Sequence, residues 1–163
     1  MMLASGVTPV VELLAAGVPL GLGTDGPAGS NNDLNLMEEM DLAAKLQKVT
    51  RRNPRALNAR QALELATIGG AGALHMEAEI GSLEPGKKAD LIILSLNVPH
   101  AVPLYDLYGQ IVYALKASDV ETVVVGGRPL MQNRRVLTLD EETLIARARE
   151  YGVKVKRSLS ASP

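Results

Sequence analysis

Apolar residues at the start of the chain fall into blocks whose period changes. Residues 8–16 (TPVVELLAA) repeat at helical spacing, with Thr8 and Pro9 suited to open a short helix and Gly17 suited to end it. Residues 18–23 (VPLGLG) carry no polar side chain. Because a strand covered on both faces shows no alternation, this block predicts a buried strand in a parallel sheet.

Two further helices are predicted after a glycine-rich loop. Over residues 33–49 apolar residues gather on one helical face, and Asp41 with Lys45 forms an i,i+4 pair on the other. Asn58 and Gln61 match a capping box that opens the second helix, which a cluster of glycines then interrupts. This succession of strand and helices is typical of the α/β class.

Short strands replace this pattern from about residue 77. A Pro-Gly turn at residues 84–87 and the pair Gly126-Gly127 indicate tight turns, and residues 104–116 read as a helix with Leu107, Ile111 and Ala114 on one stripe. Strands are predicted over residues 90–96, 121–125, 128–131 and 134–137, with a turn at Gln132-Asn133.

The chain is predicted to close with one more helix. Thr138 and Glu141 form a T-x-x-E capping box that opens a helix to about residue 155, whose residues Leu144, Ala148 and Tyr151 we expect to face inward. The predicted units are an α/β part over residues 1–76, a mainly β part over 77–137, a terminal helix over 138–157 and a tail over 158–163.

Composition narrows the classes of partner. The 163 residues are 47% hydrophobic and 21% charged, and no run of about 18 apolar residues predicts a membrane span. With 17 basic and 18 acidic residues the net charge is −1, which argues against a nucleic-acid partner. The absence of cysteine excludes disulfides and thiolate metal sites. Residues 1–6 do not resemble a signal peptide, and we expect a cytoplasmic protein.

The segment LGTDGPAGSNNDL, residues 22–34, carries the candidate chemistry. Asp25 follows the predicted strand, at the sheet edge where α/β enzymes place catalytic groups, and a carboxylate there can bind a metal or act as a general base. Asp25 is equally an ordinary turn residue that hydrogen-bonds its own backbone. Ser30, Asn31 and Asn32 are similarly open between capping the next helix and contacting a substrate.

Histidine sets the tightest limit on metal chemistry. The chain has two, His75 and His100, whereas a catalytic zinc site takes about three protein ligands. We expect His75 to pack or cap a helix and His100 to be solvated. Asp90 is expected to bond backbone near a turn, and the arginine pairs at residues 51–52 and 134–135 to lie on solvated faces.

Several segments together resemble the metal-dependent amidohydrolase superfamily, in its carboxyl-terminal portion. They are LGTDGPAGSNNDLNLMEEMDLAAKLQK, GSLEPGKKADLIIL, VETVVVGGRPLMQNRRVLT and MLASGVTPVVELLAAGV, and the resemblance covers about residues 2–155. Within the superfamily the chain is most similar to the methylthioadenosine/S-adenosylhomocysteine deaminase and chlorohydrolase-like group.

This resemblance implies the end of a (β/α)₈ barrel (its eighth strand and following helices), part of a small β-sandwich domain and a terminal helix. It implies a divalent metal, zinc or iron, for which Asp25 is a ligand and a proton shuttle, while Ser30 and Asn31 are candidates for substrate binding. The implied reaction is hydrolytic deamination of a purine nucleoside-like small molecule such as methylthioadenosine or S-adenosylhomocysteine. The alternatives are another branch (triazine-type chlorohydrolase, guanine or cytosine deaminase, cyclic amidase) or a non-catalytic structural remnant.

The family's H-x-H pair, barrel histidines and proton-donating glutamate have no counterpart in this sequence. A complete barrel needs about 250 residues, so we expect those residues upstream of Met1 and an isolated chain that is inactive. Because exposed strand edges and apolar faces favour association, we expect a homo-oligomer or a complex with a chain that supplies the missing barrel.

Overall fold

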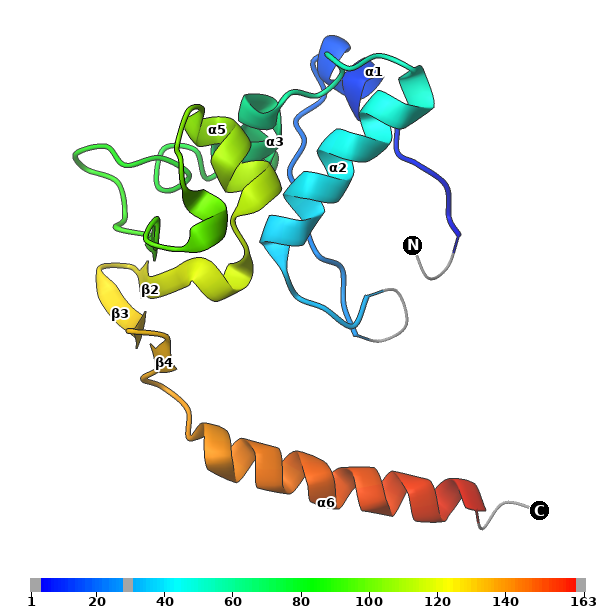
Figure 1. The fold of residues 1–163 in the computed structure, drawn as a ribbon, viewed down its shortest axis with the longest axis vertical. Coiled ribbons are helices and arrows are strands. Elements are labelled where there is room, and N and C mark those ends of the chain that lie inside the picture. The colour runs from blue at the N-terminus through cyan, green and yellow to red at the C-terminus, as the bar shows by residue number, and fades with distance from the viewer. Residues whose placement is uncertain (1–3, 28–30, 161–163) are drawn as a thin grey trace.

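The computed structural model describes residues 4–27 and 31–160. Helices gather at one end of the molecule, a small sheet lies beside them, and one long helix extends away from both (Figure 1). Among the described residues, no helix is both long and apolar enough to cross a membrane. The arrangement is mixed α/β, as expected.

The helical end contains α1 (Val10–Ala15), α2 (Leu36–Arg51), α3 (Ala59–Ala66) and α4 (Ile68–Ala73). The α2 helix begins where the Asn35 side chain accepts a hydrogen bond from the Glu38 amide, and it ends at Arg52, whose φ is +51°. The capping box predicted for α3 is confirmed, because Asn58 and Gln61 each accept from the other's backbone N–H.

The glycine cluster does not interrupt a helix, and that prediction is wrong. Gly69, Gly70 and Gly72 lie inside α4, while the break falls at Thr67, whose backbone (φ −129°, ψ −102°) is not helical. A Cβ atom at Gly69 would lie 3.0 Å from the carbonyl oxygen of Leu20. The glycines therefore allow α4 to pack directly against the backbone of residues 20–21.

The strand predicted over residues 18–23 does not form within the described chain. The segment is extended, but it pairs with no strand among the described residues. Its backbone bonds to helices instead: the Leu22 amide donates to the Leu65 carbonyl of α3 over 3.0 Å, and the Val18 amide donates to the Leu13 carbonyl of α1 over 3.0 Å. A strand needs neighbours for its N–H and C=O groups, and the residues around it supply helices instead.

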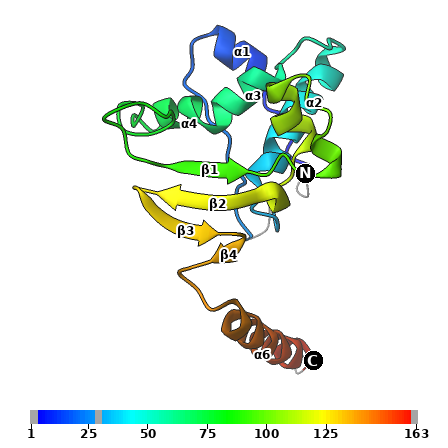
Figure 2. The same cartoon turned by 60° about the vertical axis from the view of Figure 1, so that its left-hand side comes forward.

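The sheet is an antiparallel meander in the order β1-β2-β3-β4 (Figure 2). The Gly126-Gly127 turn is confirmed, since its φ values of +57° and +75° suit the twist of a two-residue hairpin. The next turn falls at Asn133-Arg134, one residue later than predicted, which leaves the last strand two residues long. The strands are β1 (Leu91–Leu94), β2 (Val120–Val125), β3 (Arg128–Gln132) and β4 (Arg135–Val136).

A series of short helical turns joins β1 to β2: η1 (Pro99–Ala101), α5 (Leu107–Gly109), the π-helical η2 (Gln110–Ala114) and η3 (Ala117–Asp119). The helix predicted over residues 104–116 is therefore shorter than expected, because the Asp106 side chain accepts from the Tyr108 and Gly109 amides and fixes its start. Val112 in the wider π turn and Leu115 just after it are buried, and Ile111 of the predicted stripe packs against the core, whereas Leu107 is exposed.

The core lies where α2, α3 and η2 meet. Its buried residues are Met37, Met40, Ala44, Ala59, Ala62, Ala101, Val112 and Leu115. Residues from either side of position 77 thus share one core, and the division into domains near that position stays a prediction. The small α1 helix is attached to this core through α2, by an ion pair between Glu12 and Arg51 and by the Gln47 side chain, which donates to the Thr8 carbonyl over 2.8 Å. Arg51 is therefore partly buried, whereas Arg52, Arg134 and Arg135 are exposed as expected.

The terminal helix α6 (Glu141–Ser160) does not pack inward. None of its described side chains is buried, and it extends away from the sheet in Figure 1. The predicted inward positions of Leu144, Ala148 and Tyr151 are therefore wrong. Its cap is Asp140, which accepts from the Thr143 amide over 3.1 Å, rather than Thr138, and the helix continues past residue 155.

Candidate functional site

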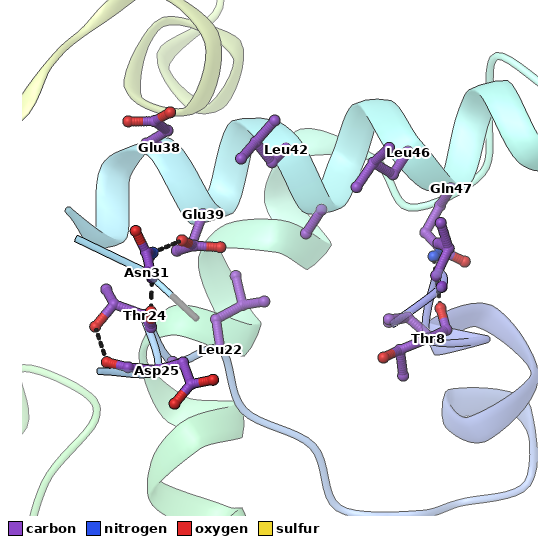
Figure 3. A pocket seen from close by; sticks show the side chains of 15 residues that line it. Thr8, Leu22, Thr24, Asp25, Asn31, Glu38, Glu39, Leu42, Leu46 and Gln47 are labelled. Carbon is purple, nitrogen blue, oxygen red and sulfur yellow. Dashed lines mark hydrogen bonds between the residues drawn. The ribbon is translucent and has the colours of Figure 1, made fainter. Parts of the chain in front are cut away.

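A cavity of about 370 Å³ separates the extended segment from α2 (Figure 3). Its middle is apolar, with Leu22 facing Leu42 and Leu46 of the helix. Each end is polar. Thr8 and Gln47 lie at one end, and the other end is formed by Thr24, Asp25, Asn31, Glu38 and Glu39. The candidate acid predicted from the sequence thus lines a cavity.

Asp25 combines a turn conformation with an available oxygen. Its φ is +56°, in the left-handed region that aspartate tolerates better than most residues. The Oδ1 atom accepts a hydrogen bond from the Gly26 amide over 2.8 Å, as expected of a turn residue. The side chain is exposed, and Oδ2 makes no hydrogen bond with the residues that the structure describes. That oxygen is free to bind a cation or to accept a proton.

Asp25 fits a divalent metal as one ligand. A carboxylate oxygen exposed at the mouth of a cavity is suitable for zinc. Within residues 4–27 and 31–160, however, no group of three or more His, Asp or Glu side chains is placed to hold a metal ion. His75, in the left-handed conformation just after α4, is exposed and is not brought into such a group. The described residues therefore bring no complete set of metal ligands together, and the metal role of Asp25 stays a prediction.

Asn31, the candidate for substrate binding, is already occupied by protein partners. Its Nδ2 atom donates to the Thr24 carbonyl over 2.9 Å and to Glu39 Oε1 over 2.8 Å (Figure 3). Its Oδ1 atom accepts from the Asp33 amide over 2.9 Å. The side chain thus connects the Asp25 loop to α2. Ser30, the second candidate, lies outside the described residues.

A histidine–aspartate pair joins the turns beside the sheet. The Asp119 side chain, 4% exposed, accepts from the Lys116 amide over 2.7 Å, and its Oδ2 lies 2.8 Å from Nε2 of His100. The hydrogen bond from His100 lowers the pKa of the Asp119 carboxyl despite its burial. The expectation that His100 is merely solvated is wrong. Nothing in the sequence singles out Asp119. Its bond to the Lys116 amide spans three residues and is an ordinary turn contact, and its histidine partner lies 19 residues away in the sequence.

The predicted role of Asp90 is confirmed, since its Oδ1 accepts from the Gly126 amide over 2.5 Å. This bond connects the start of β1 to the hairpin that follows β2. It supports the sheet and lies outside the cavity at Asp25.

Known proteins similar to this chain are amidohydrolases and deaminases. The model of the amidohydrolase family matches residues 1–130. A 5-methylthioadenosine/S-adenosylhomocysteine deaminase of Desulforudis audaxviator is 52% identical over 148 residues, which are 91% of this chain and 34% of that protein. The chain thus spans about a third of the length of the curated relatives it matches.

Two solved structures share the fold. A zinc-bound adenosine deaminase from Xanthomonas campestris superposes with a TM-score of 0.91 at 38% identity, over 95% of this chain and 35% of that one. An atrazine chlorohydrolase from Arthrobacter aurescens, complexed with zinc, superposes with a TM-score of 0.80 at 31% identity, over 89% of this chain and 32% of that one.

Proposed function

This chain belongs to the amidohydrolase family, and we propose that it forms the carboxyl-terminal part of a metal-dependent purine deaminase. In this proposal residues 1–76 are the last strand and helices of a (β/α)₈ barrel, residues 77–137 are part of a β-sandwich domain, residues 138–157 are the terminal helix, and residues 158–163 form a tail. The 52% identity to a methylthioadenosine/S-adenosylhomocysteine deaminase, over a third of that enzyme, supports it.

The observation that carries the proposal is the position of Asp25. Its free Oδ2 lies after an extended segment that a complete barrel would pair as its eighth strand. Residues 18–23 carry no polar side chain, as a strand covered on both faces requires. Catalytic groups of such barrels lie at the carboxyl ends of the strands. Asp25 then faces the substrate side of the barrel.

The proposed reaction is hydrolysis of the carbon–nitrogen bond to the amino group of methylthioadenosine, S-adenosylhomocysteine or a similar purine nucleoside. When bound, zinc would make water a better nucleophile near neutral pH. Asp25 would contribute one carboxylate oxygen to hold the ion and would accept a proton from the attacking water. It would then pass this proton to the departing nitrogen, which leaves as ammonia. The zinc bound by two structural relatives supports the choice of metal.

The remaining metal ligands belong to the part of the enzyme that this chain does not match. The isolated chain is then inactive and binds its metal only together with that part. The partners expected of it are a small-molecule substrate and a polypeptide that completes the barrel, and its association with a second copy stays a prediction, as does its cytoplasmic location.

A second candidate is a chlorohydrolase of the same family, favoured by the TM-score of 0.80 to an atrazine chlorohydrolase. In a hydrolytic dechlorination Asp25 would likewise accept a proton from the attacking water, but chloride would leave the ring carbon without taking that proton. The higher TM-score and identity to the adenosine deaminase favour deamination.

A chimera tests this function. In it, the present chain replaces the matching 148 residues of the Desulforudis relative, and zinc content and ammonia release from methylthioadenosine are measured. We expect about one zinc per chimera and measurable deamination, with neither in the isolated chain. Asp25→Asn should reduce turnover by a factor on the order of 10³ or more, because the proton acceptor is removed.

The matched control is Asp33→Asn, which changes an exposed acid of the same loop. This variant should retain turnover and zinc. A chimera that binds zinc and dechlorinates atrazine without deaminating purines would support the second candidate. Deamination that survives Asp25→Asn would contradict the assignment of Asp25.

A further inference from the structure

Asn31 holds the backbone on both sides of Asp25. Its Nδ2 atom donates to the carbonyl of Thr24, the residue before Asp25, over 2.9 Å (Figure 3). Its backbone N–H donates to the carbonyl of Gly26, the residue after Asp25, over 3.2 Å. The Thr24 carbonyl and the Asp25 amide share one rigid peptide plane. The first bond therefore fixes the plane from which the Asp25 side chain projects.

This support matters because the conformation of Asp25 is costly. Its φ of +56° lies in the left-handed region, which is less favourable than a negative φ even for aspartate and persists only where its surroundings hold it. The bonds made by Asp25 itself are local, from the Gly26 amide to Oδ1 and from the Thr24 hydroxyl to its carbonyl. Asn31 supplies the bonds that cross the loop.

Glu39 fixes Asn31 in turn. Its Oε1 atom, on α2, accepts the second hydrogen of the Asn31 amide over 2.8 Å, and a carboxylate acceptor makes this bond stronger than a neutral one would. Because the Thr24 carbonyl and Glu39 both require a donor, only one orientation of the Asn31 amide satisfies them. The neighbouring residue Met40 is buried in the core, so the helix turn that carries Glu39 is well anchored.

From these contacts we propose that Asn31 and Glu39 are positioning residues that hold Asp25 in the conformation required for metal binding and proton transfer. Asn31 does not contact the substrate, because both of its amide hydrogens are used within the protein. The proposal rests on the proposed function of Asp25. It assigns to Glu39 of α2 a role in catalysis without any contact to the substrate.

Kinetics of the chimera described above test the proposal. In Asn31→Ala and Glu39→Ala, kcat should fall by about 10- to 100-fold, as for other outer partners of metal ligands, while KM stays close to the parent value. Glu39→Gln keeps an acceptor oxygen and should restore most of the lost kcat. Asp33→Asn remains the control for kcat, and Glu38→Ala is the matched control for the hydrogen exchange below, since the Glu38 side chain makes no hydrogen bond with the described residues.

Hydrogen exchange of the isolated chain gives a readout that needs neither metal nor activity. Mass spectrometry should show faster exchange over residues 20–35 in Asn31→Ala and Glu39→Ala than in the parent, with no change in Glu38→Ala or Glu39→Gln. Unaltered exchange in Glu39→Ala would overturn the positioning role of Asn31 and Glu39. A parent chain in which this segment exchanges at the rate of an unfolded peptide would overturn it too.

The outcomes separate the inference from the function on which it rests. An inactive parent chimera would count against the proposed function. Hydrogen exchange would still decide whether Asn31 and Glu39 hold the Asp25 loop in place. An active chimera with parental kcat in both alanine variants would overturn the positioning role. A higher KM with unchanged kcat in Asn31→Ala would show that Asn31 contacts the substrate, and would overturn it too.

Discussion

Gly21 and Gly70 approach so closely that a Cβ atom at Gly21 would lie 2.7 Å from the Cα atom of Gly70. The extended segment that leads to Asp25 and the helix α4 are therefore in direct backbone contact. Leu22, the next residue, lines the cavity at Asp25. The contact between Gly21 and Gly70 therefore determines how closely this segment packs against the helices. Any side chain at residue 21 must displace it.

The variant Gly21→Ala should lower the free energy of unfolding by about 1–3 kcal/mol, because overpacking a tight contact forces the backbone to move. Gly23→Ala is the control, since nothing lies within 4 Å of a Cβ atom there and its φ is not positive. It should change stability by less than about 0.5 kcal/mol. Urea unfolding of both variants measures the difference, and equal midpoints would contradict the close packing.

Lys48 should contribute to stability although it carries a charge. Its Nζ atom donates over 2.8 Å to the Leu57 carbonyl and over 2.8 Å to the Tyr113 hydroxyl, which connects α2 to η2. Leu57 is 2% exposed. Lys48→Met should thus cost about 1–3 kcal/mol, because it leaves a buried carbonyl without a donor.

Lys88→Met serves as the comparison for Lys48. Lys88 pairs with Glu79 at a site where both side chains are about half exposed. Exposed pairs of this kind contribute less than about 1 kcal/mol. Similar losses in the two lysine variants would show that the hydrogen bonds of the half-buried Lys48 amine add no special stability.

The pair of His100 and Asp119 predicts a pH dependence of stability. Its hydrogen bond lowers the pKa of Asp119 in the folded chain, whereas the pKa of an aspartate in the unfolded chain is about 3.9. The unfolded state therefore binds the proton first as pH falls. The stability due to this carboxylate is complete above about pH 4 and is lost as pH falls through the folded pKa below that value.

Unfolding at a series of pH values down to 3 measures this effect as the difference between the parent and Asp119→Asn. The difference should be constant above the unfolded pKa and should shrink at lower pH. In His100→Ala, which removes the donor, most of this shrinkage should disappear. A parent advantage that grows as pH falls would contradict the direction of the shift.

Removal of residues 140–163 should leave the rest of the chain folded. No described side chain of α6 is buried, so the melting temperature should change little, by the equivalent of about 0.5 kcal/mol or less. The helix exposes an apolar stripe at helical spacing, which includes Leu144, Tyr151 and Leu159 at 46%, 58% and 72% exposure. If this stripe causes association, light scattering should show fewer chains per particle for the shortened chain than for the full chain. A large loss of melting temperature would show that α6 packs.

Features that depend on neighbours in sequence could be predicted. The box of Asn58 and Gln61 and the glycine turn at residues 126–127 are confirmed, because capping and tight turns depend on a few consecutive residues. Asp25 was found in the same way, from one acid between glycines at the end of an apolar block. Its metal role stays a prediction.

Features that depend on partners distant in sequence could not. The amide of Asn31 has no sequence signal that chooses Glu39 over a substrate, and Asp119 gives no sign of a partner 19 residues away. Both bonds form because the helices and turns of the folded chain bring the side chains together.

Local sequence thus determined the cap at Asn58, the turn at Gly126-Gly127 and the identity of the candidate acid. Tertiary packing decided which apolar blocks are covered. Residues 18–23 became an extended segment against α3 and α4 instead of a paired strand, and α6 became an exposed helix. The physical reason is that burial and strand pairing are properties of two surfaces, and a sequence pattern describes only one of them.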